Sequence, residues 1–450
     1  MKEKRSDWWK ATAGLAVLAL LAVGLGLLFR GQGQTPAATG PTATVTAQPA
    51  VTQEVAATPT TMIVPTGTAP TSPTVVTPTE TTQPEPTSPI PGLDDYLFGE
   101  PQVVLTNPHR YIGIAGWLPD SEHLLITRGD PERPLREFIE TFNVRTGDVR
   151  RLGERNSLSV KPLWLAATQE VAYTDWVGKE YRALYISRGE TAERQTIATT
   201  LSSLHIGADP KGQQIVFFAE AAGERPQLWD VQQETVQTLP FTLAPLAYTT
   251  GPMMPSPYRI AWHPSEDKVA FYNNYHFFVM NLDTDQVQEI ELSTDDYGQV
   301  LWAMNAQWSP NGRYIAMVTT SGDLPVESSE LTILDAVSGE LRSMHPGQSI
   351  YPGQDYVTDM AWAPDSYHLA VLAVVRRDEI GVEYDGLYLT GVDNTEFQRL
   401  APEHEFGGAW GEELAWSPDG LHLAVLCPTS EESRLCILPI SQEGPKGGQP

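Results

Sequence analysis

Three histidines lie in the segments that separate sequence repeats, near carboxylates with which they could bind a metal ion. The set is His109, His345 and His404 with Asp355, Glu403 and Glu405. A metal ion held there would polarise a substrate oxygen or activate water, as in a lyase or hydrolase. Nothing in the spacing requires these side chains to converge. We therefore predict no catalytic residue, no metal and no cofactor, with a polysaccharide lyase or hydrolase as the alternative.

A second set of histidines is regular, because His123, His368 and His422 each lie six residues after a tryptophan. The shared position puts them at the start of the same strand in three different repeats. We interpret them as solvated strand-edge residues and not as ligands of one ion. Carboxylates recur in the turns before them, at Asp120, Asp365 and Asp419. Calcium needs several oxygens around one ion, whereas one carboxylate per turn is typical of turn stabilisation.

Nucleophilic catalysis has little support in the sequence. The Gly-x-Ser-x-Gly pattern of an exposed nucleophilic serine does not occur, and no hydrolase-sized segment remains outside the repeats. We expect no fused serine peptidase, and a binding function is favoured over an enzymatic one.

The elements that position these residues come from a repeated stretch, whose best copy begins Trp416-Ser-Pro-Asp-Gly-Leu-His-Leu-Ala-Val. The other copies start at Trp117, Trp262, Trp308 and Trp362, with two degraded copies at Trp164 and Ala208. The seven anchors lie 44 to 54 residues apart, a period that is typical of propeller blades. Because the tryptophans recur at one blade position, we expect them to pack between blades and not to stack on sugars.

One repeat contains four short strands. The first ends at the tryptophan, Pro-Asp-Gly or an equivalent turns the chain, and a second apolar strand follows. A third strand ends in Asp or Asn, as at Asp230 and Asn281, and a further turn leads to a fourth strand of mixed polarity. Four such strands form one blade.

The last repeat lacks its fourth strand, because the chain runs into Gly, Pro and Lys soon after residues 435–440. Residues 103–106 have the pattern of a fourth strand, although no blade precedes them. If the two ends pair, the ring closes and leaves no open sheet edge. The sequence therefore predicts an all-β, seven-bladed propeller over residues 101–442. Six blades are the alternative if the copy at Trp164 or Ala208 is not a true blade.

The motif Trp-Ser-Pro-Asp-Gly followed by Leu-Ala-Val resembles the repeat of TolB-like, or WD40-like (PD40), β-propellers. The match is best at Trp308, Trp362 and Trp416, and the resemblance covers residues 101–442. It implies the propeller fold and is weak for function. That family includes periplasmic binding and scaffolding proteins, propellers fused to prolyl-oligopeptidase-type hydrolases, and some polysaccharide lyases.

The long loops between blades are rich in aromatic and methionine residues. By analogy with related propellers, these loops share one face, the loop face, with the loops between second and third strands. The Pro-Asp-Gly turns lie on the other face, the turn face. Loops often carry binding residues, and interfaces favour Tyr, Trp and Met; the alternative is that several of them pack into the mouth of the ring. The predicted binding residues are Tyr248, Met253, Met254, Tyr297, Trp302, Tyr351, Tyr356, Phe406 and Trp410.

Cys427 and Cys436 are the only cysteines. The predicted strands place them at facing ends of a hairpin in the closing blade, where an exported protein can form a disulfide. We predict this disulfide, with two buried thiols as the alternative.

The N-terminal region predicts attachment to a membrane. Residues 1–10 form a basic tail and residues 11–29 an uninterrupted apolar run. At about 1.5 Å per residue this run nearly spans a ~30 Å hydrocarbon core, and the basic flank favours a cytoplasmic N-terminus. We predict a transmembrane signal anchor, with cleavage and secretion as the alternative. Residues 31–92 are mostly Thr, Pro, Ala, Val and Gly, which predicts a disordered stalk.

Charge constrains the partners. The chain has 29 basic and 56 acidic residues, and the first 91 residues are balanced, so the negative charge lies on the repeats. Nucleic acids and anionic membrane surfaces attract basic patches, so neither is expected as the main partner. We predict a monomeric propeller on the extracytoplasmic side of the membrane, attached to it by a single-pass anchor. Its expected function is that of a non-enzymatic scaffold that binds an envelope protein or glycan through the loop face.

Overall fold

The computed structural model describes the repeat region with short gaps. The described residues are 91–108, 111–133, 135–156, 160–177, 181–187, 194–219, 225–242, 258–273, 276–292, 302–320, 329–344, 356–376, 383–394, 396–407, 413–429 and 432–442. The predicted basic tail, the predicted transmembrane segment and nearly all of the predicted stalk lie outside them. Within the described ranges, no helix has the length and hydropathy needed to cross a membrane.

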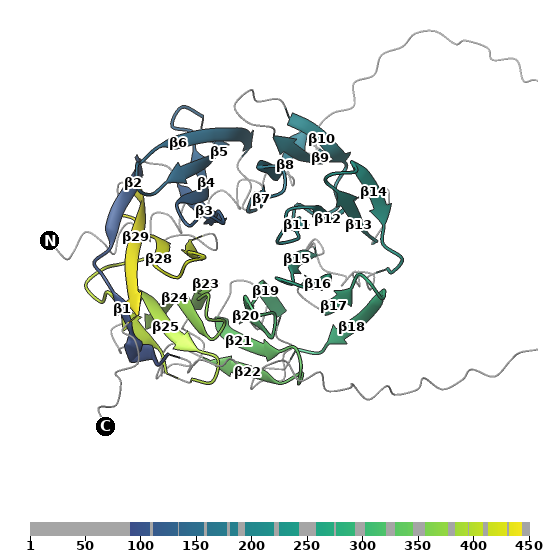
Figure 1. Cartoon of the computed structure of the whole chain (residues 1–450). Coiled ribbons are helices and arrows are strands. Elements are labelled where there is room, and N and C mark those ends of the chain that lie inside the picture. Colours follow the sequence, from purple (N-terminus) through teal and green to yellow (C-terminus); the bar gives the residue numbers. More distant parts are fainter. Residues whose placement is uncertain are drawn as a thin grey trace, which may run out of the picture. The chain divides into compact units, whose positions relative to one another are not determined.

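Seven antiparallel sheets follow one another around a ring, with the first strand of each sheet near the centre (Figure 1). Six of them contain four consecutive strands each, ordered from the inner to the outer strand. Blade 1 comprises β3 (Ile112–Trp117), β4 (His123–Gly129), β5 (Arg136–Asn143) and β6 (Val149–Asn156). Blade 2 comprises β7 (Leu163–Leu165), β8 (Glu170–Val177), β9 (Tyr181–Ser187) and β10 (Arg194–Thr199). Blade 3 comprises β11 (Gly207–Ala208), β12 (Gln214–Phe218), β13 (Pro226–Asp230) and β14 (Thr235–Thr238).

The same order continues in the second half of the ring. Blade 4 comprises β15 (Arg259–Trp262), β16 (Lys268–Tyr272), β17 (Phe277–Asn281) and β18 (Gln286–Ile290). Blade 5 comprises β19 (Trp302–Trp308), β20 (Tyr314–Thr320), β21 (Ser329–Asp335) and β22 (Leu341–Met344). Blade 6 comprises β23 (Tyr356–Trp362), β24 (His368–Arg376), β25 (Glu383–Gly391) and β26 (Gln398–Leu400).

Blade 7 closes the ring by pairing the two ends of the described chain. Its consecutive strands are β27 (Leu414–Trp416), β28 (His422–Leu426) and β29 (Glu432–Gln442). The strand β2 (Gln102–Pro108) pairs with β29 and puts Val103 opposite Cys436. The predicted closure and the seven-bladed ring are therefore confirmed, and the degraded copies form true blades.

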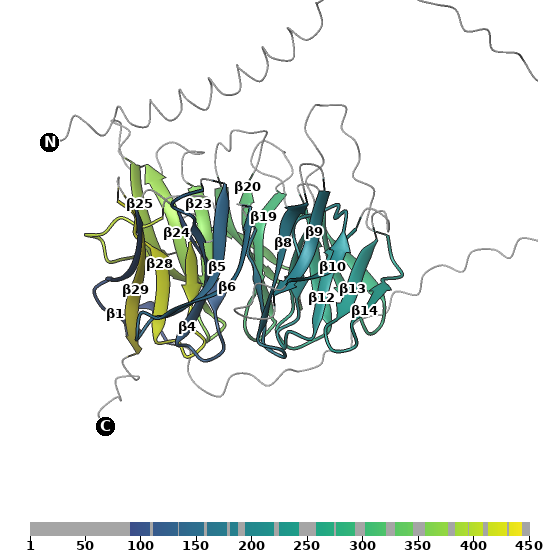
Figure 2. The same ribbon diagram turned by 90° about the horizontal axis from the view of Figure 1, so that it is seen from above.

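A short N-terminal strand, not expected from the sequence, extends this closure. It is β1 (Tyr96–Phe98), which follows the 3-10 helix η2 (Leu93–Asp95) and lies ahead of residue 101. It pairs with the far end of β29, where Tyr96 lies opposite Gln442. Ile440 donates its backbone N–H to Leu421 O in the turn after β27, at 2.8 Å. The end of β29, and with it β1, therefore lies at the turn face (Figure 2).

The repeated tryptophans tie neighbouring blades together. Trp308, Trp362 and Trp416 are 9 %, 7 % and 8 % exposed. The indole Nε1 of Trp362 donates to Gln307 O of blade 5 at 3.0 Å, and that of Trp117 donates to Ala415 O of blade 7 at 3.0 Å. Each acceptor lies one residue before the anchor of the preceding blade. The prediction that these residues pack between blades is confirmed.

The turn carboxylates act within their own turns. Asp120 Oδ1 accepts the backbone N–H groups of Glu122 and His123, both at 2.9 Å. Asp365 Oδ1 does the same for Tyr367 and His368, at 2.9 and 3.0 Å. The prediction of turn stabilisation is confirmed for both.

The prediction that His368 is solvated is wrong. Its side chain is 1 % exposed, whereas those of His123 and His422 are 36 % and 34 % exposed. The ring of Tyr96 covers His368 with 5.0 Å between centroids, and Tyr96 Oη donates to Asp365 Oδ2 at 2.5 Å. Burial alone would raise the pKa of Asp365, but the hydrogen bonds from His368 and Tyr96 lower it to about 2. The unexpected strand β1 thus contributes to this burial, together with the adjacent ring of Tyr367, whose centroid also lies 5.0 Å from that of His368.

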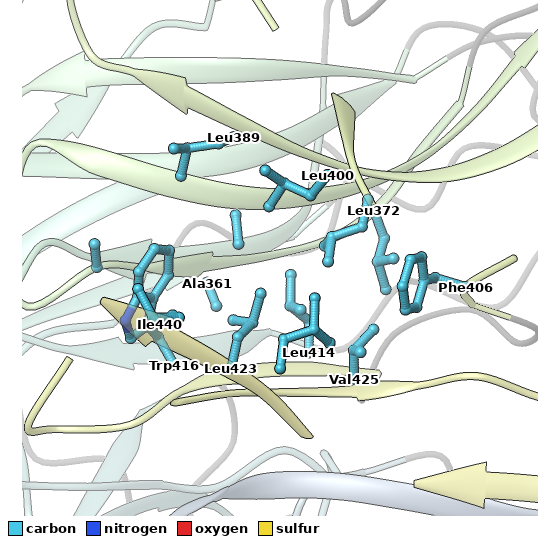
Figure 3. Close-up of a cluster of buried hydrophobic side chains, with 14 of the residues drawn as sticks. Ala361, Leu372, Leu389, Leu400, Phe406, Leu414, Trp416, Leu423, Val425 and Ile440 are labelled. Atoms are coloured by element: carbon cyan, nitrogen blue, oxygen red, sulfur yellow. The ribbon is translucent and has the colours of Figure 1, made fainter. Parts of the chain in front are cut away.

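Seven apolar clusters of the described chain fill the seven contacts between adjacent blades. Figure 3 shows the cluster between blades 6 and 7, where Leu372 and Leu400 face Leu414 and Val425. The core therefore lies between the sheets, and the loops and turns at the two faces are available for other roles.

Candidate functional site

Most of the predicted loop-face residues fall outside the described residues. These are Tyr248, Met253, Met254, Tyr297, Tyr351 and Trp410. Trp302 begins β19, and only its backbone is described. Tyr356 begins β23 and is half-buried, with its backbone opposite Val374. The structure thus places Trp302 and Tyr356 at the ends of inner strands, and the binding role of the set stays a prediction.

Phe406 does not lie on an exposed surface. It is 2 % exposed and packs into the cluster between blades 6 and 7 (Figure 3). The residue after it, Gly407, has φ of 89° and donates its N–H to Leu426 O at 2.9 Å, which fixes the chain against blade 7. The expectation that Phe406 contributes to the binding surface is corrected, because its ring fills the gap between two sheets.

The two cysteines are joined by a disulfide, with Cα atoms 5.9 Å apart. Cys427 follows β28, and Cys436 lies on β29 opposite Val103. The bond therefore links the second and third strands of the blade in which the chain ends meet.

Asp359, which the sequence did not single out, connects three blades near the centre of the ring. It is fully buried in the inner strand of blade 6. Its Oδ2 accepts the backbone N–H groups of Glu413 and Leu414 in blade 7, at 2.9 and 3.1 Å. Its Oδ1 accepts from Asn305 Nδ2 of blade 5 at 3.1 Å. Both oxygens are occupied by structural hydrogen bonds, so this carboxylate positions strands.

The histidines considered as metal ligands do not form a set in the described part of the chain. His109, His345 and Asp355 lie outside it, and Glu403 and Glu405 flank His404 in the same segment. His404 Nε2 lies 3.2 Å from Glu100 Oε2, between β1 and β2. Among the described residues, no group of three or more His, Cys, Asp or Glu side chains is placed to hold a metal ion.

One histidine near the inner strands has a strongly perturbed pKa. Burial and the nearby positive charge of Arg259 lower the pKa of His205 to about 3. Its backbone N–H donates to Ser203 Oγ at 3.1 Å, and that hydroxyl donates to Tyr258 O at 3.0 Å. The imidazole is therefore neutral at physiological pH, in a region where blades 3 and 4 meet.

A cavity of about 590 Å³ lies between blades 1 and 2. It is lined by β5 and β6 of blade 1 and by β8, β9 and β10 of blade 2. Figure 1 shows β6 and β10 as neighbours on the outer rim of the ring. Its charged lining residues are Arg136, Arg151, Glu154, Arg155, Asp175 and Arg194.

One buried and one partly exposed ion pair hold the walls of this cavity. Arg155 and Glu137 form an ion pair in which both side chains are fully buried, and Arg155 also donates to Val160 O at 2.6 Å. Asp175 Oδ1 accepts two hydrogen bonds from Asn156, and its Oδ2 accepts from Arg194 at 2.9 Å. These contacts fix the walls, because breaking a buried pair by removing one partner costs about 3–5 kcal/mol.

Arg151 is held differently. Its guanidinium lies 3.5 Å from the centre of the Phe138 ring. The nearest carboxylate, Glu140, is 3.8 Å away and already accepts two hydrogen bonds from Arg128, both at 2.8 Å. The side chain of Arg151 is 53 % exposed. Arg151 therefore forms a loose ion pair with Glu140 beside the Phe138 ring. Because side chains alternate along β5 and Ile139 packs toward blade 2, this group lies on the face of blade 1 away from blade 2.

Sequence reasoning missed this cavity. The one available signal was the concentration of arginines at positions 150, 151 and 155 of an otherwise acidic chain. The position of Arg155 beside blade 2 depends on how two blades pack, which no local pattern encodes.

Comparisons with known proteins give fold-level similarity. No protein-family description matches the chain, and no curated protein matches it. Among solved structures, it is similar to an oligogalacturonate lyase in complex with manganese, with 12 % identity and a TM-score of 0.49 over 78 % of this chain and 97 % of that chain. It is similar to the β-propeller domain of the Trilobed protease from Pyrococcus furiosus, with 12 % identity and a TM-score of 0.48 over 76 % and 99 %. It is also similar to TolB from Acinetobacter baumannii, with 14 % identity and a TM-score of 0.36 over 68 % and 77 %.

Proposed function

We propose that this protein is a membrane-tethered, extracytoplasmic propeller whose loop face binds a protein or glycan partner of the cell envelope without catalysing a reaction. The apolar run at residues 11–29 is the anchor and residues 31–92 are the stalk. An extended stalk of this length reaches on the order of 190 Å at most, at about 3.1 Å per residue. The propeller can therefore meet partners well away from the membrane.

The observation that carries this proposal is the point at which the chain enters the propeller. Tyr96 lies at the turn face, where its hydroxyl bonds to the turn residue Asp365. The chain then follows β2 along the rim until Pro108 lies opposite Glu432, at the loop-face end of β29. The described chain thus enters the propeller at the turn face, and the strand ends that flank the long loops between blades lie at the opposite face.

The chemistry of the described polar residues also favours binding over catalysis. Asp359 uses both oxygens to join blades, and His368 is buried beneath Tyr96. A general acid or base must reach a substrate proton, and these groups are committed to the fold. Loop residues on a rigid ring are instead suited to presenting a constant binding surface.

The loop-face proposal can be tested by comparing two sets of substitutions on opposite faces. Tyr351→Ala, Tyr356→Ala and Trp410→Ala together alter the loop face. Val337→Ala and Leu421→Ala alter exposed apolar residues on the turn face, where they are 77 % and 52 % exposed. Each form is recovered from solubilised membranes after crosslinking, and its partners are identified.

The expected result is that the loop-face variant loses a partner that the wild type and the turn-face variant retain. Equal recovery by all three forms contradicts the proposal. Incubation with cell-wall polysaccharides serves as a parallel arm, because turnover of a polysaccharide would establish the enzymatic alternative. Digestion of the propeller by protease added to intact cells would support its extracytoplasmic position, and full protection would contradict it.

A further inference from the structure

A layer of polar residues surrounds the centre of the ring at one position of the repeat. In six of the seven repeats, the residue three positions before the anchor is charged or polar: Lys161, His205, Arg259, Asn305, Asp359 and Glu413. The strand register confirms that three of these positions are equivalent. Arg259, Asn305 and Asp359 each lie in an inner strand, opposite Tyr272, Val318 and Leu372 of the adjacent second strand.

In blades 5 to 7, hydrogen bonds between blades join the residues of this layer. Asn305 Nδ2 donates to Asp359 Oδ1 at 3.1 Å, and Asp359 Oδ2 accepts from the backbone of Glu413 at 2.9 Å. Asp359 also accepts the backbone N–H groups of Met360 and Leu414. The negative charge of Asp359 is therefore stabilised by donors from its own blade and from the two neighbouring blades.

In blades 2 to 4 the same layer carries positive charge. Lys161 and Arg259 are half-buried, and in the described part of the chain neither side chain forms a hydrogen bond or an ion pair. The positive charge of Arg259 helps to lower the pKa of His205 on the neighbouring blade, so this imidazole is neutral. Figure 1 shows the inner strands of these three blades, β7, β11 and β15, side by side at the centre of the ring.

This arc of three residues has the chemistry of an anion site. The surrounding strands have a low dielectric constant and strengthen the field of a half-buried cation. A guanidinium offers a planar set of N–H donors that matches carboxylate or phosphate oxygens, and an ammonium group offers three more donors. The neutral imidazole of His205 has one N–H to donate. The rest of the chain, with 56 acidic against 29 basic residues, repels anions from other surfaces.

We propose that the inner strands of blades 2 to 4 bind a small ligand with a carboxylate or phosphate group, which Arg259 and Lys161 contact and to which His205 donates a hydrogen bond. The inner strands begin at the loop face, because each ends at its anchor and is followed by a turn of the turn face. The site uses none of the residues altered in the loop-face variant and does not need the membrane anchor. Its failure is therefore distinguishable from failure of the loop-face function.

The binding test uses three probes with the same three-carbon skeleton and the purified full-length protein in detergent. Glycerate carries a carboxylate, glycerol 3-phosphate carries a phosphate, and glycerol carries neither, so the probes distinguish the two anionic groups. Binding is measured by calorimetry at low salt and repeated at higher salt. We expect one or both anions to bind at least about 10-fold more tightly than glycerol, with weaker binding at higher salt.

Two variants test the residues, after their urea midpoints have established that they fold. Arg259→Gln and Lys161→Gln should each weaken binding of the anion by about 10-fold, the effect of losing one charge-assisted contact. Lys211→Gln is the matched control, because it makes the same change at an exposed lysine in the turn of blade 3. Its affinity should equal that of the wild type.

A second readout does not depend on any variant of the two cations. An anion beside Arg259 offsets the positive charge that lowers the pKa of His205, so the bound anion should raise this pKa. NMR titration of the histidine rings with and without the anion measures the change, and His205→Gln identifies the signal.

Three results would overturn the proposal. They are binding of glycerol as tight as that of the two anions, no binding of any probe into the millimolar range, and an affinity that neither Arg259→Gln nor Lys161→Gln alters. A pKa of His205 that stays constant when the anion binds would place the anion elsewhere and would also overturn it.

Discussion

Replacing Asp359 tests whether the centre of the ring depends on one buried carboxylate. Asp359→Ala removes the acceptor for Glu413 N, Leu414 N and Asn305 Nδ2, and the backbone N–H of Met360 also loses a 2.9 Å contact to Oδ1. A buried donor left without an acceptor costs about 1–3 kcal/mol. Because Asp359 is fully buried and several donors are affected, we expect a loss of about 3–5 kcal/mol in the free energy of unfolding.

The matched substitution is Asp359→Asn, which keeps the shape and one acceptor oxygen. The side-chain NH2 group of the asparagine takes the place of one carboxylate oxygen and faces N–H donors there, so about half of the hydrogen bonds are kept. The loss in the free energy of unfolding should therefore be smaller than for alanine. Asp393→Ala is the control, because that carboxylate is 59 % exposed and pairs with Arg342 at the surface. Its effect should be within about 1 kcal/mol.

The assay is urea unfolding of the full-length protein in detergent, followed by tryptophan fluorescence, with the midpoint and the slope both recorded. A lower midpoint at constant slope reports lost stability. A double-mutant cycle with Asn305→Ala isolates the contact between blades 5 and 6. If Asp359→Ala is no more destabilising than Asp393→Ala, the reasoning that this carboxylate holds three blades together is refuted.

Three further predictions concern closure and pH. Replacing both Cys427 and Cys436 by serine should lower the free energy of unfolding by about 2–3 kcal/mol, which is the entropic value for so short a loop. The urea midpoint from tryptophan fluorescence, measured with and without reductant, checks this. A wild-type midpoint that does not change with reductant would contradict it. The pKa of His205 is about 3 in the fold and about 6.5 when unfolded, so the unfolded chain binds the proton first. The free energy of unfolding should therefore fall as the pH is lowered from about 6.5 to 3, by at most about 1.4 kcal/mol per pH unit from this group. The free energy of unfolding of His205→Gln should depend less steeply on pH. Equal slopes for the two proteins would contradict the assignment. Tyr96→Ala should uncover His368 and speed proton exchange of its ring in NMR spectra, with Tyr96→Phe intermediate, whereas no change would show that β1 does not protect this histidine.

The blade repeat could be predicted because its signal is local. A tryptophan, a tight turn and an apolar strand lie within about ten residues of one another, so each copy is visible on its own. Beside the degraded copy at Ala208, the fold requires a residue without a side chain. Gly207, just before it, lies so close to Ile260 of blade 4 that a Cβ atom there would collide with that side chain. The glycine at position 207 therefore lets blade 4 approach.

The features that the sequence did not reveal depend on contacts between distant segments. The strand β1 has three residues, too few to show a period of two, and its partner is β29 at the other end of the propeller. The burial of His368 follows from that pairing, so it was hidden for the same reason. The cavity between blades 1 and 2 likewise depends on the stacking of two sheets, and Phe406 appeared to be a loop aromatic because its loop folds into a blade contact.

The ion pair buried within blade 1 also has an energetic consequence. A buried ion pair such as Arg155 with Glu137 is often no better for stability than apolar residues of the same volume. Apolar clusters fill all seven contacts between adjacent blades, the one between blades 1 and 2 included, so the packing of the blades does not rest on this pair.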